Sequence, residues 1–323
     1  MSLKLDGLAS FVAVAESGSI SEAARRLHLA KSVVSERLAE VERTLGATLL
    51  HRTTRRLSLT EDGAAFLERA TRIVREVDEA AADMAERRGT LAGPLRLSAP
   101  VTFGRLHLGP ALYPFLAAHP GIEMTLEFDD RRVDAAADGF DAVVRHGPLL
   151  DSRLVAWKLA PSRRVLVASP AYLARHGTPA DAQQLQDHRG IFYTNRGVAD
   201  WRFEGAEGAV VLRAKSALRL NNGDVMHDAV VAGLGLGLMP SFIAGQSLRT
   251  GALQVVDIGL QAPEEWLYVA RPQGRPASAK LRALVDWLRS AFGEPPYWEQ
   301  WRQSGPERPQ PAKRRSARPA RGS

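Results

Sequence analysis

The sequence predicts an α/β chain in which a winged helix-turn-helix and a long linker helix precede a two-lobed domain. Three observations lead to this prediction. Short amphipathic helical patterns and an arginine-rich hairpin fill residues 1–60, and an apolar heptad repeat follows over residues 61–88. From residue 93 to residue 293, strand and helix patterns alternate. The period of the apolar residues is the primary guide to secondary structure.

The first sixty residues contain three helical patterns. An apolar face is spaced for a first helix over residues 5–15, and Gly18 ends it. Ser21 is placed to cap a second short helix through its hydroxyl. A third helix ends at Gly46 and buries apolar residues spaced four, three and four apart, which are Val34, Leu38, Val41 and Leu45. Its opposite face carries short polar side chains, and such a face can enter a DNA major groove.

A basic hairpin follows the third helix. Leucines bracket the segment His51 to Arg56, which predicts a two-stranded wing tipped with arginines. Residues 25–56 hold eight Lys or Arg against three Glu, whereas residues 61–88 hold five Arg against eight acidic residues. Basic charge is therefore concentrated where the wing and the third helix lie. This favours DNA binding over a helical bundle with a merely solvated basic face.

Two motifs carry a family resemblance. The sequence GSISEAARRL begins at Gly18, and the hairpin ends in RLSLTEDG at Gly63. With these motifs the region resembles the amino-terminal domain of a LysR-type transcriptional regulator, and the resemblance covers nearly the whole chain. It implies a homodimer or homotetramer on double-stranded promoter DNA, with RNA polymerase as a further candidate partner. The DNA-binding residues that it implies are Lys31, Ser32, Ser35, Glu36, Arg37, Arg52, Thr53, Arg55 and Arg56.

Two positions depart from the family pattern. Ala30 stands where the family usually has Ser or Thr, so the cap of the third helix is either missing or supplied by Ser32. Glu36 stands where the family often has Arg. A carboxylate there is repelled by phosphate but can accept a hydrogen bond from the amino group of cytosine, so Glu36 indicates a different operator sequence.

The predicted linker helix covers residues 61–89. Its apolar residues follow alternating steps of four and three, at Phe66, Ala70, Ile73, Val77, Ala80 and Met84. One helix cannot bury such a stripe alone. The stripe packs either on its own domain or on a partner subunit, and the resemblance favours a dimerisation helix.

Strand and helix patterns alternate in the second domain. Strands are expected at residues 95–99, 124–128, 141–145 and 164–168, and a helix at residues 103–118. This alternation predicts parallel sheets covered on both faces. The chain would return through residues 266–271 and end in a helix over residues 277–292.

The resemblance here is to the two-lobed type 2 periplasmic-binding-protein-like fold of LysR-type effector domains. It implies an effector-binding domain over residues 93–293. The first lobe would comprise residues 93–162 and 266–293, and the second lobe residues 163–265.

A small ligand in such a fold lies between the lobes, near strand and helix ends. The residues expected to bind it are Ser98, Thr102, Phe103, Arg145, His146, Asn222 and Asp224. A single arginine beside helix ends suits a carboxylate, which predicts an acidic small-molecule effector. Alternatively, Arg145 pairs with Asp129 or Asp141, and the glycine-rich run after residue 232 only allows close packing.

Composition limits the remaining possibilities. The chain of 323 residues has a formal charge of +7, but residues 304–323 alone hold six Lys or Arg against one Glu. We expect residues 294–323 to form a basic disordered tail, which either raises nonspecific DNA affinity or only solubilises the chain. There is no cysteine, which excludes disulfides and thiol-based redox sensing. No apolar run approaches the length of about eighteen residues that a membrane span needs, and no secretory signal is evident, so we expect a cytoplasmic protein without a membrane partner.

The sequence contains no recognisable catalytic apparatus. The histidines are scattered without metal-ligand spacing, and no phosphate-binding or dinucleotide-binding motif is present. We therefore expect no enzymatic activity, no cofactor and no metal site. The main alternative is a two-lobed small-molecule-binding protein without DNA function, which would leave residues 1–88 unexplained, and an enzyme built on the two-lobed domain comes third.

Overall fold

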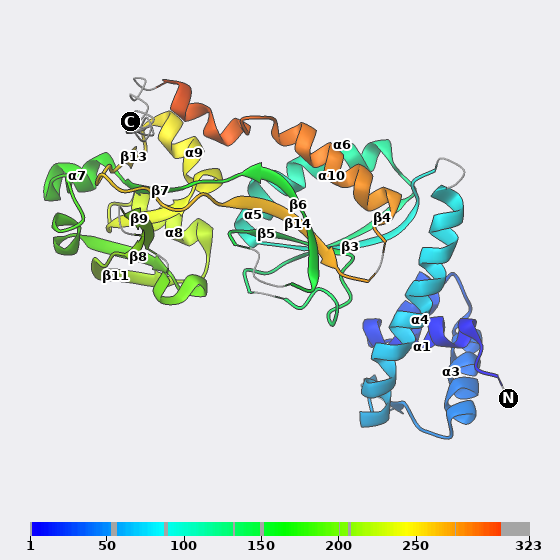
Figure 1. Ribbon diagram of the computed structural model, residues 1–323. Coiled ribbons are helices and arrows are strands. Elements are labelled where there is room, and N and C mark those ends of the chain that lie inside the picture. The colour runs from blue at the N-terminus through cyan, green and yellow to red at the C-terminus, as the bar shows by residue number, and fades with distance from the viewer. Residues whose placement is uncertain are drawn as a thin grey trace, which may run out of the picture.

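The computed structural model describes residues 2–52, 57–86, 90–131, 133–148, 152–199, 201–205, 208–274 and 276–304. A small helical domain at the amino terminus is followed by a long helix and then by a domain with two five-stranded sheets (Figure 1). Among the described residues, no helix combines the length and the apolar composition that crossing a membrane requires.

The amino-terminal domain contains three helices. They are α1 (Leu5–Ser17), α2 (Ile20–Arg26) and α3 (Lys31–Leu45). Gly18 and Gly46 end α1 and α3 with φ angles of 64° and 66°, as predicted, because only a residue without Cβ adopts this left-handed conformation freely. The helices share one core, in which Ala23 and Ala24 let α2 approach its neighbours closely.

Two details of this domain, the cap of α2 and the exposure of Leu45, correct the sequence prediction, and the cap of α3 decides between its two alternatives. Ser19, not Ser21, caps α2, because Ser19 has the extended backbone of an N-cap and its hydroxyl accepts a hydrogen bond from the amide of Glu22. Ala30 is the N-cap of α3 and provides no side-chain hydrogen bond, so the cap is missing. Leu45 is exposed rather than buried, because it lies in the last turn of α3 beyond the core.

The wing consists of β1 (Leu50–Arg52) and β2 (Leu57–Leu59), which pair antiparallel. Directly after β2, α4 (Glu61–Glu86) begins at the edge of the helical core. Phe66 stacks against Phe11 with ring centroids 5.5 Å apart, and Ala70 is fully buried. Farther along the same helix, Ile73, Val77 and Met84 are exposed. The predicted stripe therefore packs on its own domain only over its first half.

Each lobe of the second domain is built on a five-stranded sheet. The first sheet has the order β4-β3-β5-β14-β6, formed by β3 (Gly93–Ala99), β4 (Ile122–Phe128), β5 (Ala142–His146), β6 (Leu154–Pro161) and β14 (Trp266–Pro272). The second has the order β11-β8-β12-β7-β13, formed by β7 (Arg164–Ala168), β8 (Arg189–Tyr193), β11 (Lys215–Leu220), β12 (Leu236–Pro240) and β13 (Gln254–Val255). A hairpin of β9 (Arg202–Gly205) and β10 (Gly208–Val211) extends from the second lobe.

The sheets are mixed, so the prediction of purely parallel sheets is wrong. In the first lobe β3 runs parallel to β4 and β5, but β14 runs antiparallel to β5 and β6. In the second lobe β12 is parallel to β8 and antiparallel to β7. The reason is that the chain crosses between the lobes twice, once from β6 to β7 and once on its return to β14. Because β7 and β14 enter their lobes at these crossings, they run opposite to β12 and β5, which end there.

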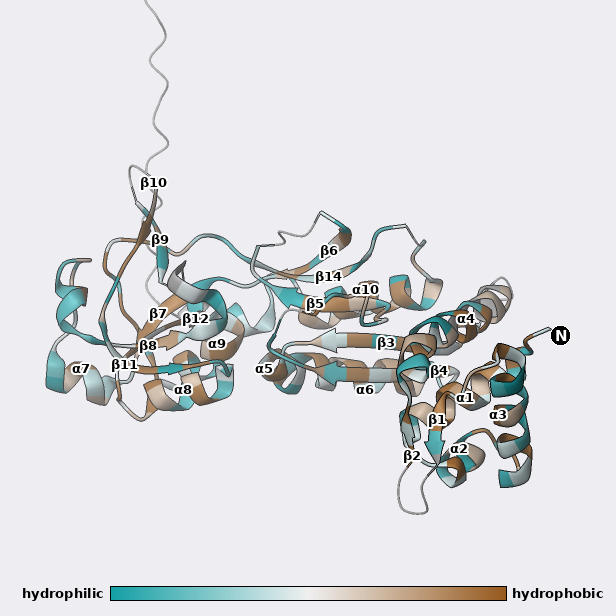
Figure 2. Ribbon diagram, turned by 90° about the horizontal axis from the view of Figure 1, so that it is seen from below, coloured by the Kyte–Doolittle hydropathy of each residue, from teal (hydrophilic) through white to brown (hydrophobic). Residues whose placement is uncertain are grey.

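Helices cover both sheets and complete the cores (Figure 2). In the first lobe, α5 (Val101–Phe103), a π-helical turn (Gly104–Leu108) and α6 (Gly109–Ala118) follow one another without a break, and α10 (Ala279–Phe292) packs beside α6. The second lobe carries α7 (Pro170–His176), α8 (Gly223–Val231) and α9 (Ser241–Thr250). Short 3₁₀ turns occupy residues 184–187 and 194–199.

The carboxyl-terminal part of the chain corrects the predicted tail. Residues 297–304 form a 3₁₀ helix, η4 (Tyr297–Ser304), which packs against α9. Trp298 and Glu299 are buried there, and the Ser241 hydroxyl donates a hydrogen bond of 2.6 Å to the Glu299 carboxylate. Disorder was therefore the wrong prediction for residues 294–304, because their tryptophans supply apolar surface to bury. Residues 305–323 lie outside the described part of the chain.

Candidate functional site

Helix α3 presents a polar face on the surface of the amino-terminal domain. Lys31, Ser32 and Glu36 are exposed and Ser35 is partly exposed, whereas Val34 and Leu38 hold the opposite face in the core. Because Ala30 provides no side-chain acceptor, the first amides of α3 keep no side-chain cap. Free amides at the start of a helix bind anions such as phosphate.

Arg37 lies apart from this face. Its guanidinium donates a hydrogen bond of 2.9 Å to the Asp6 carboxylate on α1. The structure thus gives Arg37 a contact within the domain, whereas the sequence alone grouped it with the DNA-binding residues.

The wing is tied to α3 by a residue that the sequence prediction missed. One carboxylate oxygen of Glu42 accepts hydrogen bonds from the amides of Leu49 and Leu50, at 2.9 and 3.2 Å. Thr60 adds a hydrogen bond of 2.7 Å from its hydroxyl to the carbonyl of Thr48. The polar face and the base of the wing therefore keep a fixed relation. The side chain of Arg52, and Thr53, Arg55 and Arg56 entirely, lie outside what the structure describes.

The second candidate site lies where the two lobes meet. Ser98, at the end of β3, is fully buried, and its hydroxyl accepts a hydrogen bond of 3.3 Å from the Arg145 guanidinium. Arg145 also donates to the carbonyl of Val144 at 2.7 Å. Its charge helps to lower the pKa of Asp129, although the main cause of that shift is the hydrogen bond from Arg131. Two of the predicted effector residues, Ser98 and Arg145, are thus in contact.

Asp130 joins the two lobes and was missed by the sequence prediction. One of its carboxylate oxygens accepts a hydrogen bond of 3.0 Å from the amide of Val101, and the other faces the Asn222 amide at 3.4 Å. Asn195 of the second lobe donates to the backbone carbonyl of Asp130 at 3.0 Å. Burial raises the pKa of Asp130, against the effect of these donors. The amide of Val101 begins a helix whose first amides were expected to bind an effector. It is instead hydrogen-bonded to a carboxylate of the protein itself.

Thr102 and the start of α8 complete this contact. Asn222 caps α8 by accepting hydrogen bonds from the amides of Asp224 and Val225, at 3.0 and 3.1 Å. Asp224 forms an ion pair with Arg105 of the first lobe. A Cβ at Gly223 would lie 2.7 Å from the Thr102 hydroxyl, so only glycine allows this approach. That buried hydroxyl has no hydrogen-bond partner among the described residues.

Two predicted effector residues lie elsewhere. Phe103 is fully buried in an aromatic core with Phe242, Phe292 and Trp298, so its side chain packs the lobe instead of facing a ligand. His146 is buried at the hinge, where its Nε2 lies 3.2 Å from the carbonyl of Ser162.

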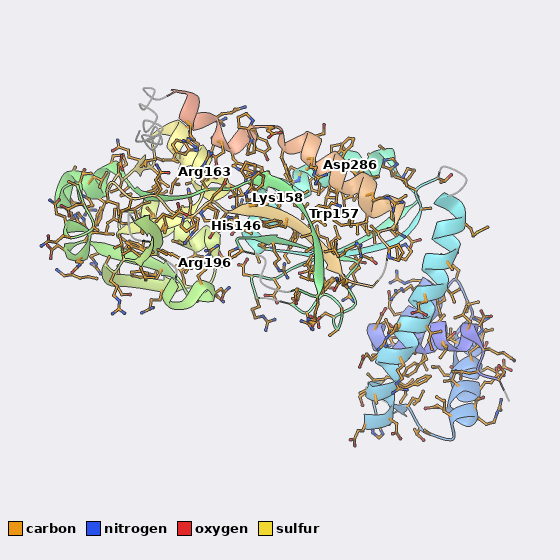
Figure 3. The ribbon with its side chains drawn as sticks, viewed as in Figure 1. His146, Trp157, Lys158, Arg163, Arg196 and Asp286 are labelled. Atoms are coloured by element: carbon orange, nitrogen blue, oxygen red, sulfur yellow. The ribbon has the colours of Figure 1, made fainter. Side chains whose placement is uncertain are left out.

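The hinge is a cluster of buried polar groups. Arg196 from the second lobe donates two hydrogen bonds, of 2.7 and 2.6 Å, to the Glu265 carboxylate. Arg196 and His146 both lie where the two lobes meet (Figure 3). Glu265 also lies 3.3 Å from Nε2 of His146, and its carbonyl accepts a hydrogen bond of 2.9 Å from the amide of Ser162. These contacts join the two crossover segments. Burial lowers the pKa of His146 to about 4, which keeps its imidazole neutral near pH 7.

No metal centre is present in the part of the chain that the structure describes: three or more His, Asp or Glu side chains never gather there in a way that could hold an ion. The polar groups at the lobe junction are instead engaged with one another. The arrangement suits reversible binding of a small polar molecule and a change in the relation between lobes.

Two family profiles match the chain. Residues 5–64 match "Bacterial regulatory helix-turn-helix protein, lysR family", and residues 88–293 match "LysR substrate binding domain". An HTH-type transcriptional repressor of Pseudomonas aeruginosa is 32% identical over 296 residues, which cover 91% of this chain and 93% of the relative. The HTH-type transcriptional regulator DmlR of Escherichia coli is 33% identical over 296 residues, with 90% and 95% covered.

Solved structures agree with these matches. The structure of CrgA, a LysR-type transcriptional regulator from Neisseria meningitidis, superposes with a TM-score of 0.57 at 30% identity, covering 88% of this chain and 97% of that chain. The full-length structure of the Vibrio cholerae virulence activator AphB gives a TM-score of 0.55 at 27% identity, with 89% and 99% covered.

Proposed function

Because this chain belongs to the LysR family of DNA-binding transcriptional regulators, we propose that α3 and the wing read one half of a promoter site, and that a small molecule bound between the lobes changes how two such domains are placed on DNA. The observation that carries this proposal is the exposed polar face of α3 beside a wing that Glu42 fixes to the same helix. A helix and a wing held in one geometry can contact a major groove and its flanking backbone together.

The residues proposed for DNA differ in their roles. Ser35 and Glu36 lie on α3 where a groove-entering helix contacts base edges. Lys31 and the uncapped amides at the start of α3 suit phosphates, which position the protein without reading sequence. The wing residues Arg52, Thr53, Arg55 and Arg56 stay in the proposal as backbone contacts, on the strength of their charge and position in the sequence.

We propose a homodimer, or a tetramer of two dimers, as the DNA-binding unit. The exposed residues Ile73, Val77 and Met84 follow one another at steps of four and seven residues on α4, beyond the part that packs on its own domain. An exposed apolar stripe of this spacing is buried by a second helix. Two wings on paired linkers would bind two half-sites with an increased effective concentration. RNA polymerase is the proposed partner at the promoter, and the cytoplasm is the proposed location.

We propose an acidic effector for the interlobe site, as the sequence suggested, with Arg145 and Ser98 as its first contacts. Asp130 adds a condition that the sequence did not show. An incoming carboxylate must displace Asp130 from the amide of Val101 or bind beside it. Since ligand shifts an equilibrium only through different affinities for two states, release of Asp130 from Asn222 is a natural difference between those states. We propose no enzymatic activity.

Selection of genomic DNA fragments with purified protein at two salt concentrations tests the proposal. We expect enrichment of a partly palindromic site whose two halves are separated by about one helical turn of DNA. Ser35→Ala and Glu36→Gln should change the enriched sequence, whereas a uniform loss of binding would contradict base readout. Salt-sensitive binding without any enriched sequence would contradict the regulator proposal as a whole.

A further inference from the structure

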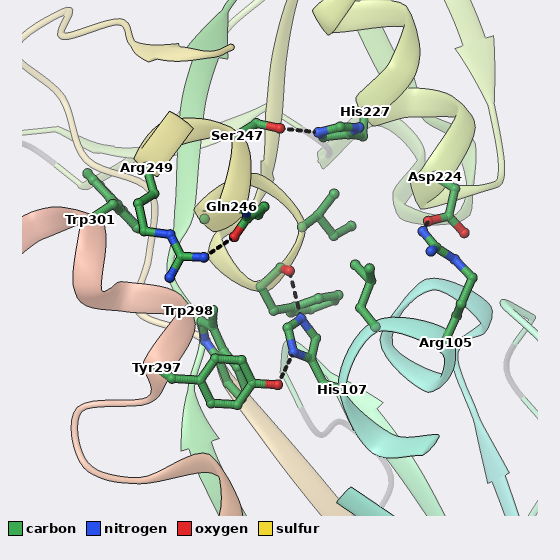
Figure 4. A pocket seen from close by; sticks show the side chains of 14 residues that line it. Arg105, His107, Asp224, His227, Gln246, Ser247, Arg249, Tyr297, Trp298 and Trp301 are labelled. Carbon is green, nitrogen blue, oxygen red and sulfur yellow. Dashed lines mark hydrogen bonds and ion pairs between the residues drawn. The ribbon is translucent and has the colours of Figure 1, made fainter. Parts of the chain in front are cut away.

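A cavity of about 250 Å³ lies beside the interlobe contact, and of the residues expected to bind the interlobe effector only Asp224 lines it. It is lined by the π-helical turn of the first lobe, by α8 and α9 of the second lobe, and by η4 (Figure 4). Its apolar walls are formed by Leu106, Phe242, Ile243, Tyr297, Trp298 and Trp301.

One wall of this cavity comes from residues that the family profile does not include, because that match ends at residue 293. The wall is firmly attached. Glu299 of η4 is buried and accepts hydrogen bonds from Ser241 and Arg163, at 2.6 and 3.4 Å. A Cβ at Gly245 would lie 2.2 Å from the carbonyl of Trp298, so α9 and η4 touch backbone to backbone. The cavity is therefore a built feature of this chain.

The charged groups of the lining differ in their partners. The guanidinium of Arg249 donates to the neutral side chain of Gln246, whereas Arg105 is paired with Asp224. The indole N–H groups of Trp298 and Trp301 have no hydrogen-bond partner among the described residues, but they are buried and not accessible from the cavity. The lining thus offers one cation, Arg249, whose hydrogen-bond partner is uncharged.

The remaining polar groups of the lining are satisfied. The two ring nitrogens of His107 contact the Tyr297 hydroxyl and the carbonyl of Phe242, and burial lowers the pKa of this histidine. Nε2 of His227 contacts the Ser247 hydroxyl at 2.7 Å. Ligand recognition would therefore fall to Arg249. An apolar space with aromatic walls and one cation suits a flat apolar group that carries an anion.

We propose that this cavity is a second small-molecule site, which takes a single-ring aromatic carboxylate and places its carboxylate against Arg249. The volume is below that of sites for drug-sized ligands, which limits the occupant to about one ring. Because the cavity wall joins the first lobe, the second lobe and η4, an occupant would favour one relation between the lobes. The effect on DNA rests on the proposed function, but the binding itself does not.

Titration of the full-length protein with benzoate, followed by calorimetry and tryptophan fluorescence, tests the site. We expect benzoate to bind and to quench fluorescence, and neutral benzamide to bind at least tenfold more weakly. Arg249→Gln should weaken benzoate about tenfold and leave benzamide unchanged, since it removes one exposed cation without disturbing the core. Arg282→Gln, an exposed arginine on α10, is the matched charge control and should change neither. Trp301→Phe, which removes one indole ring from the lining, should reduce the quenching.

Arg145→Ala separates this site from the interlobe site. If Arg145→Ala abolishes benzoate binding while Arg249→Gln does not, the ligand occupies the interlobe site and the inference is overturned. Absence of benzoate binding at millimolar concentration, or binding that ignores both substitutions, would also overturn it. Binding of the benzoate-free protein to operator DNA is measured in parallel. Failure of that binding would contradict the proposed function whatever the result for this cavity.

Discussion

The carboxylate of Asp130 accepts a hydrogen bond of 3.0 Å from the backbone amide of Val101, across the loop that ends β4. This contact fills the start of the helix that begins at Val101 with an anion from the protein itself. Asn195 and Asn222 of the second lobe hold the same residue. Asp130 is therefore both a helix cap and a link between lobes, and each role can be separated by substitution.

Asp130→Asn should stabilise the protein slightly at pH 7. Burial raises the pKa of Asp130, so the ionised form is disfavoured in the folded state, and stability from this group falls as pH rises through its folded pKa. Asn keeps an acceptor for the Val101 amide without the charge. The expected increase in Tm is on the order of 2 °C at pH 7, because solvent screens a half-exposed site, and it should shrink toward pH 4. A lower Tm at pH 7 in calorimetry would show that the charge itself is needed.

His146 should make the effector domain less stable in mild acid. Burial lowers its pKa to about 4, against an unfolded value of about 6.5. Between these values the unfolded chain binds a proton that the folded chain does not, so stability is lost as pH falls from about 6.5 toward 4. His146→Gln, which retains an N–H donor for the Ser162 carbonyl, should flatten this loss in thermal melts. An unchanged pH profile would place the acid sensitivity elsewhere.

Lys31 and Arg37 should differ in their effect on DNA although both are cations of α3. Lys31 is exposed at the start of the helix, whereas Arg37 is held by Asp6. Lys31→Gln should weaken binding to all sequences and reduce the slope of affinity against salt by about one. Arg37→Gln is the matched control and should reduce that slope less. Fluorescence anisotropy over a salt series decides between them, and equal slopes would contradict the proposed phosphate contact.

Val77→Asp should dissociate the proposed dimer without unfolding its domains. Val77 is exposed on α4, so a carboxylate there costs little in the monomer, but it would be buried in an apolar seam between two linkers. We expect the dimer dissociation constant to rise at least tenfold in analytical ultracentrifugation. Arg72→Asp places the same charge on an exposed, paired position of the same helix and serves as the control. A dimer that persists in Val77→Asp would assign assembly to another surface.

Local patterns in the sequence predicted the elements well. The strand expected at residues 164–168 has those bounds in the structure, and α1 and α3 end at the glycines that the sequence indicated. The spacing of apolar residues and a glycine at the end of a helix both depend on residues that are neighbours in the chain. The sequence alone is therefore enough to predict them.

Contacts between distant residues were not predicted. Glu42 meets Leu49 through a turn, and Asp130 meets Asn222 only once the order of strands and the closure of lobes are known. The antiparallel strands follow from the crossovers and not from residue pattern. The helix over residues 297–304 was not predicted, because its tryptophans were grouped with the proline-rich and charged segment that follows them.

The close contact at the base of the wing gives α4 the mechanical role of a rod. A Cβ at Gly63 would lie 2.0 Å from the carbonyl of Leu49, so no side chain separates the first turn of α4 from the start of the wing. A helix of 26 residues is about 39 Å long, and a tilt of about 10° at one end displaces the other by about 7 Å. That distance equals about two base-pair steps of DNA. A small rotation near the lobes would thus be magnified into a whole-step displacement of the wing along the groove.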